Sequence, residues 1–240
     1  EALSTTLPQS RVSCLRLASV GLRWDALITL EAGLQGAQSL RMLRLENNMF
    51  NDHAVNSLCR VLGHNPSLRE LDVSRCHLSA ASLASLATAV GQHPNLAKLF
   101  AESQSRAEQA SEFDGAIGRA FGQALQASSA LEELNLSHVG LTHHDAEHLA
   151  GGIAQSRSLK AVTLMGNALD TMDERGLLVP GSGCEQLAVA VEASLRLHTL
   201  HVQDSSMTYA SFAAFARAWA ANPRLRYLVA QSRTQYLGKV

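Results

Sequence analysis

The stretch "LRELDVSRCHLSAASLASLATAVGQHPN" (Leu68–Asn95) decides the fold of this 240-residue chain. Its first residues alternate apolar and polar side chains, which indicates a short β-strand. Its second half has the apolar spacing of an amphipathic α-helix. The residues that follow at once, "LAKL" (Leu96–Leu99), begin in the same way. The stretch is therefore one copy of a periodic unit in which a strand is followed by a helix.

The pattern L-x-x-L-x-L-x-x-N/C-x-L recurs along the whole chain, strongly in four copies and more weakly in four others. The copies begin at residues 12, 40, 68, 96, 131, 159, 197 and 225. Five of the seven spacings between successive starts are 28 residues, a regularity that chance does not produce.

The second half of each copy also repeats. Apolar residues stand 13, 10, 9 and 6 positions before the next start, which is the i, i+3, i+4, i+7 pattern of a helix with one buried face. This pattern predicts inward faces at Val55/Leu58/Cys59/Leu62, Leu83/Leu86/Ala87/Val90, Ala146/Leu149/Ala150/Ile153 and Phe212/Phe215/Ala216/Trp219. Helix caps are expected at Asn51, Ser79, Thr142 and Thr208.

A short strand and a full helix in each unit make the chain resemble the ribonuclease-inhibitor-like leucine-rich-repeat family. The resemblance covers nearly all of the chain. It implies an α/β solenoid, or horseshoe, of about eight repeats, with a parallel sheet on the concave face and helices on the convex face. Val20, Gln104, Val139 and Arg233 depart from the asparagine expected in each turn, so irregular turns are expected there.

Two repeats are longer than the others, by seven and by ten residues. The extra residues form expected loops at about 101–114 and 170–184, on the same edge of the sheet. The unbroken repeat predicts a single domain over 1–240. Neither end shows the polar cap that a solenoid needs, so we expect a fragment of a longer chain.

Composition limits the classes of partner. Apolar residues make up 46% of the chain, enough for a continuous core, and a formal net charge of −1 predicts no general attraction to nucleic acid. No apolar run is long enough to predict a membrane span. The four cysteines lack CxxC spacing and are expected to be reduced, which fits an intracellular, cytoplasmic protein.

The side chains between the repeated leucines should line the concave face, because strand side chains alternate. They predict a wide surface of mixed polarity rather than a pocket. The residues expected to bind a partner from the strands are Arg16, Arg44, Asp72, Phe100, Asn135, Met165 and His201. From the second inserted loop, Leu177 and Leu178 are added.

Each of these assignments has an alternative. Phe100 could pack on the inserted loop that follows it, and the leucines of the second loop could fold back on the solenoid. The charged residues of the first three repeats could be a lattice of mutually paired surface charges, each worth little.

Signatures of catalysis and metal binding are missing, so no enzyme activity, cofactor or metal is expected. The Ran GTPase-activating proteins share this repeat type, and that resemblance implies a role for an arginine in a strand-to-helix turn. Arg23, Arg106 and Arg175 have such positions. Nothing else of that family's catalytic loop is recognisable.

The main hypothesis is a non-catalytic scaffold that binds one or more proteins, but neither nucleic acid nor membranes. Three alternatives stay open. The chain could be the sensing region of a nucleotide-binding immune-type receptor, a structural subunit of a large axonemal or organellar assembly, or a GTPase-activating protein of the Ran type.

Overall fold

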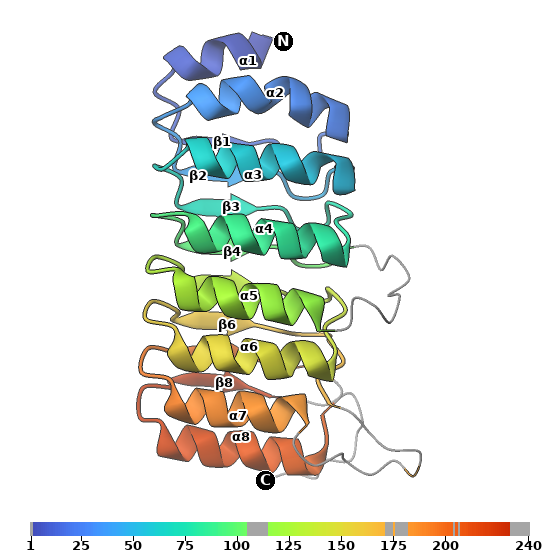
Figure 1. Cartoon of the computed structure of the whole chain (residues 1–240), viewed down its shortest axis with the longest axis vertical. Helices are drawn as coiled ribbons and strands as arrows, with labels where there is room; N and C mark the ends of the chain where they lie inside the picture. The colour runs from blue at the N-terminus through green and yellow to red at the C-terminus, as the bar shows by residue number, and fades with distance from the viewer. Residues whose placement is uncertain are drawn as a thin grey trace.

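The computed structural model describes residues 2–104, 115–170, 175, 182–203, 205 and 207–230. In this part of the chain, strands and helices alternate, and the helices form one layer in front of the strands (Figure 1). The predicted solenoid is confirmed: the strands pair in the order in which they occur, β1 to β8, in one parallel sheet.

The elements have these bounds. The helices are α1 (Ala2–Thr6), α2 (Trp24–Gly36), α3 (Val55–His64), α4 (Ala80–Gln92), α5 (Ala116–Ala127), α6 (His143–Gln155), α7 (Gly183–Ala193) and α8 (Tyr209–Ala221). Two short 3-10 helices are η1 (Leu7–Gln9) and η2 (Asp52–Ala54). The strands are β1 (Cys14–Arg16), β2 (Met42–Arg44), β3 (Glu70–Asp72), β4 (Lys98–Phe100), β5 (Glu133–Asn135), β6 (Ala161–Thr163), β7 (Thr199–His201) and β8 (Tyr227–Val229).

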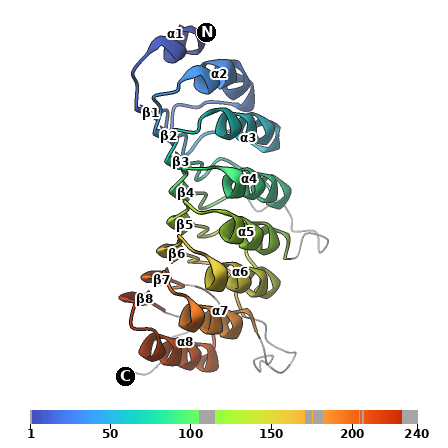
Figure 2. The same cartoon turned by 60° about the vertical axis from the view of Figure 1, so that its left-hand side comes forward.

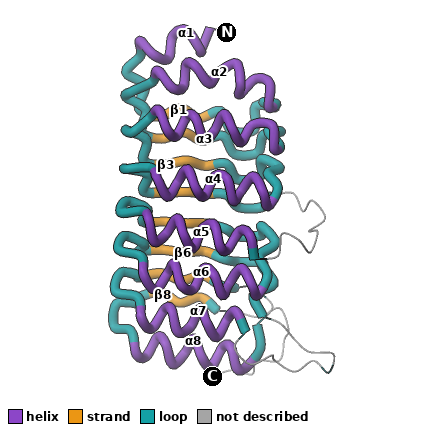
Figure 3. The backbone as a smooth tube through the Cα atoms, viewed as in Figure 1, coloured by secondary structure: helices purple, strands orange, loops and turns teal. Residues whose placement is uncertain are grey.

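The strands and the helices form two parallel stacks (Figures 2 and 3). Strands in a sheet are about 4.8 Å apart, whereas packed helices need about 8–10 Å. The helical stack must therefore be the longer one, which places the sheet on the concave side.

The core lies between the two stacks. The central residue of each inner strand, Val162 in β6 and leucine in the others, is buried. Helix residues of the core, for example Leu58, Leu86 and Leu149, are buried too. These residues belong to a single hydrophobic cluster that runs from Leu7 to Leu225. Because each repeat buries its apolar face only against its neighbours, the solenoid is stabilised by contacts between adjacent units.

The turns after β1 to β6 each use one residue with a left-handed backbone. In successive repeats these residues are Ser19, Asn47, Arg75, Ser103, His138 and Gly166, with φ between 53° and 66°. Only one of the six is glycine, so the surrounding hydrogen bonds must hold a conformation that other residues disfavour.

In several turns, a polar side chain at the inner position supplies some of those bonds. The Asn48 amide donates to the carbonyls of Leu17 (2.7 Å) and Leu45 (2.8 Å), and its oxygen accepts from the Leu22 N–H (2.9 Å). Asn167 has the same role in a later repeat, donating to Leu136 at 2.9 Å.

The expectation that Gln104 leaves its turn irregular is wrong. Its amide donates to the carbonyls of Val73 (2.8 Å) and Ala101 (3.3 Å), and it accepts from the Leu78 N–H (3.0 Å). Glutamine is one methylene longer than asparagine, but its terminal group is the same amide, so it can satisfy the same backbone groups.

A second polar column, which the sequence pattern did not reveal, lies at the opposite edge of the sheet. Its residues stand three positions before the starts of the repeats at 68, 96, 131, 159, 197 and 225. Its buried members are Asn65, His93, Ser128, Ser156, Ser194 and Asn222. In the fourth repeat, His93 Nδ1 accepts from the Leu96 N–H at 2.9 Å, and His93 Nε2 lies 3.0 Å from the Asn65 carbonyl. These side chains hold the helix-to-strand turns and link adjacent repeats.

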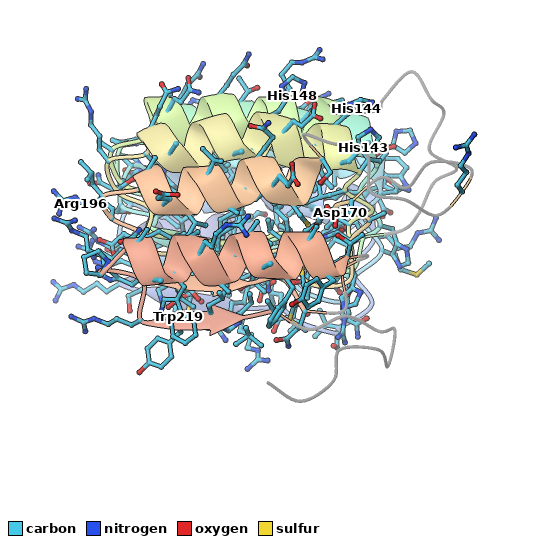
Figure 4. All side chains as sticks on the ribbon, turned by 90° about the horizontal axis from the view of Figure 1, so that it is seen from below. His143, His144, His148, Asp170, Arg196 and Trp219 are labelled. Carbon is cyan, nitrogen blue, oxygen red and sulfur yellow. The ribbon has the colours of Figure 1, made fainter. Side chains whose placement is uncertain are left out.

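Carboxylates also link the helix starts of adjacent repeats. Asp52 accepts from the Ser79 N–H, at the start of α4, at 2.8 Å. Asp170 lies beside the first turns of α7 and α8 (Figure 4), where it accepts from the N–H groups of Cys184 (3.3 Å) and Thr208 (3.1 Å). Negative charge near a helix N-terminus is favourable.

The last predicted helix face is partly wrong. Phe215 is buried, but Phe212 is only half-buried, Ala216 is exposed and Trp219 is 48% exposed (Figure 4). In earlier repeats the following helix packs against this one, as α6 packs against α5, and no helix follows α8 in the described chain.

Candidate binding surface

The predicted concave columns are confirmed by the strand register. In the register of adjacent strands, Arg16 lies beside Arg44, which lies beside Asp72. Asp72 in turn lies beside Phe100, and Phe100 beside Asn135. The same column continues through Thr163 and His201 to Val229. Met165 lies one column further on, where its carbonyl accepts from the His138 N–H. Leu177 and Leu178 lie outside the described residues.

Ion pairs cross the concave face between adjacent repeats. Arg16 Nη2 lies 2.9 Å from Glu46 Oε1, and Arg44 donates to Glu70 Oε1 through both Nη2 (2.6 Å) and Nε (2.9 Å). Further along the sheet, Lys98 pairs with Glu133 at 2.8 Å. Much of the charge predicted for this face is therefore internally paired.

The expectation of a surface without a pocket is wrong in the first five repeats. A polar hollow of about 370 Å³ lies where β1 to β5 end and their turns begin. It is lined by Arg16, Ala18, Ser19, Glu46, Asn47, Asp72, Ser74, Arg75, Phe100, Glu102 and Asn135. The depth arises because Ala18 and the serines are small while the side chains around them are long.

Four of the residues predicted to bind a partner line this hollow, namely Arg16, Asp72, Phe100 and Asn135. The sequence pattern did not single out the turn residues Ser19, Asn47 and Arg75, which stand at the same position in three successive repeats. The signal that identifies them is their common position, since they follow one another at intervals of 28 residues.

Asp72 is the carboxylate of the polar hollow whose pKa is shifted by its surroundings. Burial raises the pKa of its carboxyl group, and the charge of Glu46 raises it further. The hydrogen bonds from Ser74 and the charge of Arg44 partly oppose this rise. The Ser74 N–H donates to Asp72 Oδ1 at 3.0 Å. No cation lies within ion-pair distance of Asp72 among the residues that the structure describes.

The other two carboxylates of the polar hollow have partners. Glu46 pairs with Arg16, although its second oxygen is buried without a hydrogen-bond partner. Glu102 lies 3.8 Å from Arg75 and accepts from the Asn135 amide at 3.0 Å. Phe100 is half-buried beside these groups.

A smaller hollow of about 290 Å³ lies at the strand-to-helix edge of the first repeats, lined by Arg23, Trp24, Met49, Asn51 and His77. Trp24 contacts the His53 ring at a centroid distance of 5.1 Å. Arg23 and Arg175 are exposed, and Arg106 lies outside the described residues. Arg23 shares this hollow with one other titratable side chain, that of His77.

Three histidines, His143, His144 and His148, lie in the first half of α6, at the opposite end of the helical layer from Arg196 (Figure 4). The rings of His143 and His144 are 3.8 Å apart, and His144 lies 3.5 Å from Glu147. Among the described residues, no group of three or more histidine, cysteine or carboxylate side chains could hold a metal ion.

None of the four cysteines forms a disulfide. Cys76 and Cys184 are buried, and burial raises the pKa of both thiols, that of Cys76 to about 12. Both are therefore packing residues rather than nucleophiles. The described helices include none with the length and apolar character needed to cross a bilayer.

Comparisons with known proteins agree with this architecture, although no family model matches the chain. The chain is 30% identical over 167 residues to the human NACHT, LRR and PYD domains-containing protein 13, covering 69% of this chain and 15% of that protein. It is 29% identical over 186 residues to the pig ribonuclease inhibitor, covering 75% of this chain and 39% of the inhibitor.

Among solved structures, an internalin from Listeria monocytogenes aligns with 95% of this chain and 69% of its own, at 14% identity and a TM-score of 0.45. The chain spans well under two thirds of the length of the two relatives named above, the human protein and the pig inhibitor. With the 28-residue repeat, the parallel sheet and these relatives, the chain belongs to the ribonuclease-inhibitor-like leucine-rich-repeat family.

Proposed function

We propose that this chain is a non-catalytic repeat module that binds a partner protein through its concave face. The observation that carries the proposal is the polar hollow where β1 to β5 end. Parallel strands hold its lining residues in fixed positions, so little conformational entropy is lost when a partner is bound. An intracellular location belongs to this proposal, because all four cysteines are unpaired.

The relatives support the general role. One of them is named as an inhibitor of a ribonuclease, so a protein of this architecture acts on another protein. Open curved faces built from stacked repeats are suited to extended partners. The hollow is lined by two arginines and an aromatic residue, which are residue types enriched at protein interfaces.

A partner-capture experiment tests the proposal. The whole chain is immobilised, and the proteins that it retains are compared with those retained by the double variant Asp72→Arg, Phe100→Ala. Glu147→Arg is the matched control, because it reverses an exposed charge on the convex helix α6. We expect the double variant to lose partners that both the wild type and the control retain. Unchanged capture by the double variant would show that the concave face is not the binding surface.

A second candidate function is the sensing region of a nucleotide-binding immune-type receptor. The observation that favours it is the 30% identity to a human protein whose name includes NACHT and LRR domains. Sequencing the gene on both sides of the region that encodes this chain tests it. A neighbouring nucleotide-binding domain supports this role, and a gene without one contradicts it.

A further inference from the structure

The polar hollow is one positive charge short of neutrality. Its lining contains three carboxylates, from Glu46, Asp72 and Glu102, and two guanidinium groups, from Arg16 and Arg75. Arg16 is paired with Glu46, and Arg75 with Glu102. The negative charge that remains is that of Asp72. Its strand neighbour Arg44 also attracts this charge, but Arg44 is itself paired with Glu70.

The fold does not need this charge. Asp72 Oδ1 accepts from the Ser74 N–H at 3.0 Å, and at the same position two repeats later Asn135 Oδ1 accepts from the Ser137 N–H, also at 3.0 Å. A neutral amide therefore holds the same turn. Burial raises the pKa of the Asp72 carboxyl group, so its ionised form is disfavoured in the folded chain.

Phe100 is the strand neighbour of Asp72 and lines the same hollow. An aromatic face next to an uncompensated carboxylate is a favourable site for a planar cation, which can stack on the ring and donate to the carboxylate.

We propose that the polar hollow accepts the guanidinium group of an arginine from the partner protein, with Asp72 as the ion-pair acceptor and Phe100 as the stacking surface. This inference rests on the proposed function, since it names the chemistry by which the concave face recognises its partner. Arginine suits the site better than lysine because its flat, weakly hydrated head group can stack and donate at the same time.

The test uses the whole chain and two small probes. Nα-acetyl-arginine amide carries the guanidinium group, and Nα-acetyl-citrulline amide has nearly the same shape without the charge. Binding is followed by NMR of 13C-labelled phenylalanine rings, with the Phe100 signal assigned from a Phe100→Leu variant. Three of the six phenylalanines, Phe50, Phe121 and Phe215, are fully buried and serve as internal references.

We expect the arginine probe to shift the Phe100 signal saturably, with a dissociation constant on the order of millimolar, as for a single ion pair with stacking. The citrulline probe should leave the signal unchanged. Asp72→Asn should raise the dissociation constant at least about threefold. The matched control is Glu133→Gln, which removes a charge from the same face outside the hollow and should bind the arginine probe as the wild type does.

A second readout separates recognition from structural damage. Because the raised pKa shows that ionised Asp72 is disfavoured in the folded state, Asp72→Asn should unfold at the same temperature as the wild type or higher. Weaker binding by a variant that is at least as stable supports the proposal. Wild-type binding by Asp72→Asn, or equal shifts with the citrulline probe, would overturn it.

The two proposals can fail separately. If the double variant loses its partners but the arginine probe does not bind, the concave face is the binding surface and the arginine inference is wrong. If the arginine probe binds in the hollow but partner capture is unaffected by the double variant, the proposed function is wrong.

Discussion

Adjacent helices are joined in two different ways along the same solenoid. Between α2 and α3, Arg60 reaches across to Glu31, with Nε and Oε1 2.5 Å apart. Between α5 and α6, glycines bring the two backbones into contact, since a Cβ atom on Gly118 would lie 2.1 Å from the Asp145 carbonyl oxygen. The ion pair of the first interface can adjust through its long side chains, whereas at Gly118 the two backbones of the second interface meet directly. We therefore expect the α5–α6 interface to tolerate substitution less well than the α2–α3 interface.

The largest expected effect is at the glycine interface. Gly118→Ala places a methyl group inside the α6 backbone, so we expect it to lower the free energy of unfolding by about 3 kcal/mol or more. Urea titration followed by circular dichroism measures this. The control is Gly151→Ala in α6, where a Cβ atom meets nothing within 4 Å, and helix propensity should add up to about 1 kcal/mol. Equal effects of the two changes would contradict the difference between the interfaces.

The next largest effect is expected in a turn of the first half. Gln104→Ala leaves the carbonyls of Val73 and Ala101 and the Leu78 N–H without their side-chain partner, at a cost of about 2 kcal/mol. Gln126→Ala, on the exposed surface of α5, is the matched control and should change stability by less than about 0.5 kcal/mol. A cost at Gln104 no larger than at Gln126 would show that the turn does not depend on the amide.

A smaller effect should depend on pH. Burial lowers the pKa of His93, while its contact with the Asn65 carbonyl partly opposes the shift. The unfolded chain therefore takes up a proton before the folded one does. The contribution of His93 is complete above a pH of about 6.5, the value for an unfolded histidine, and is lost as the pH falls below it.

Thermal unfolding between pH 8 and pH 5 measures this contribution. His93→Ser is the comparison, because serine has the same position in the repeats of Ser128, Ser156 and Ser194 and does not titrate. The variant should lose stability less steeply than the wild type as the pH falls. Parallel curves for the two proteins would show that His93 does not titrate in this range.

The smallest expected effect is stabilising. Ser103 has φ of 53° in the turn where Gly166 has φ of 66°, so Ser103→Gly should raise the free energy of unfolding by roughly 1 kcal/mol. Ser85→Gly, in the regular helix α4, should lower it by a few tenths of a kcal/mol. A change of the same sign at both positions in urea titration would refute the role assigned to the turn backbone.

Particular residues show how far the sequence pattern reached. The starts of the repeats placed Arg44, Asp72 and Phe100 in one column, and the strand register agrees. The pattern did not show that Gln104 satisfies its turn, because that depends on where its amide reaches in the neighbouring repeat. It also misassigned Trp219, whose burial would require a following helix.

The sequence by itself determined the repeat, the parallel order of the strands and the columns of the concave face. These follow from the spacing of 28 residues between repeats and from the alternation of side chains along a strand, both of which can be read from the sequence. Only the tertiary structure decided which charges are paired, where the polar hollow lies and which glycines touch a neighbouring backbone. Those features depend on distances between atoms about 26 to 33 residues apart, which spacing does not fix.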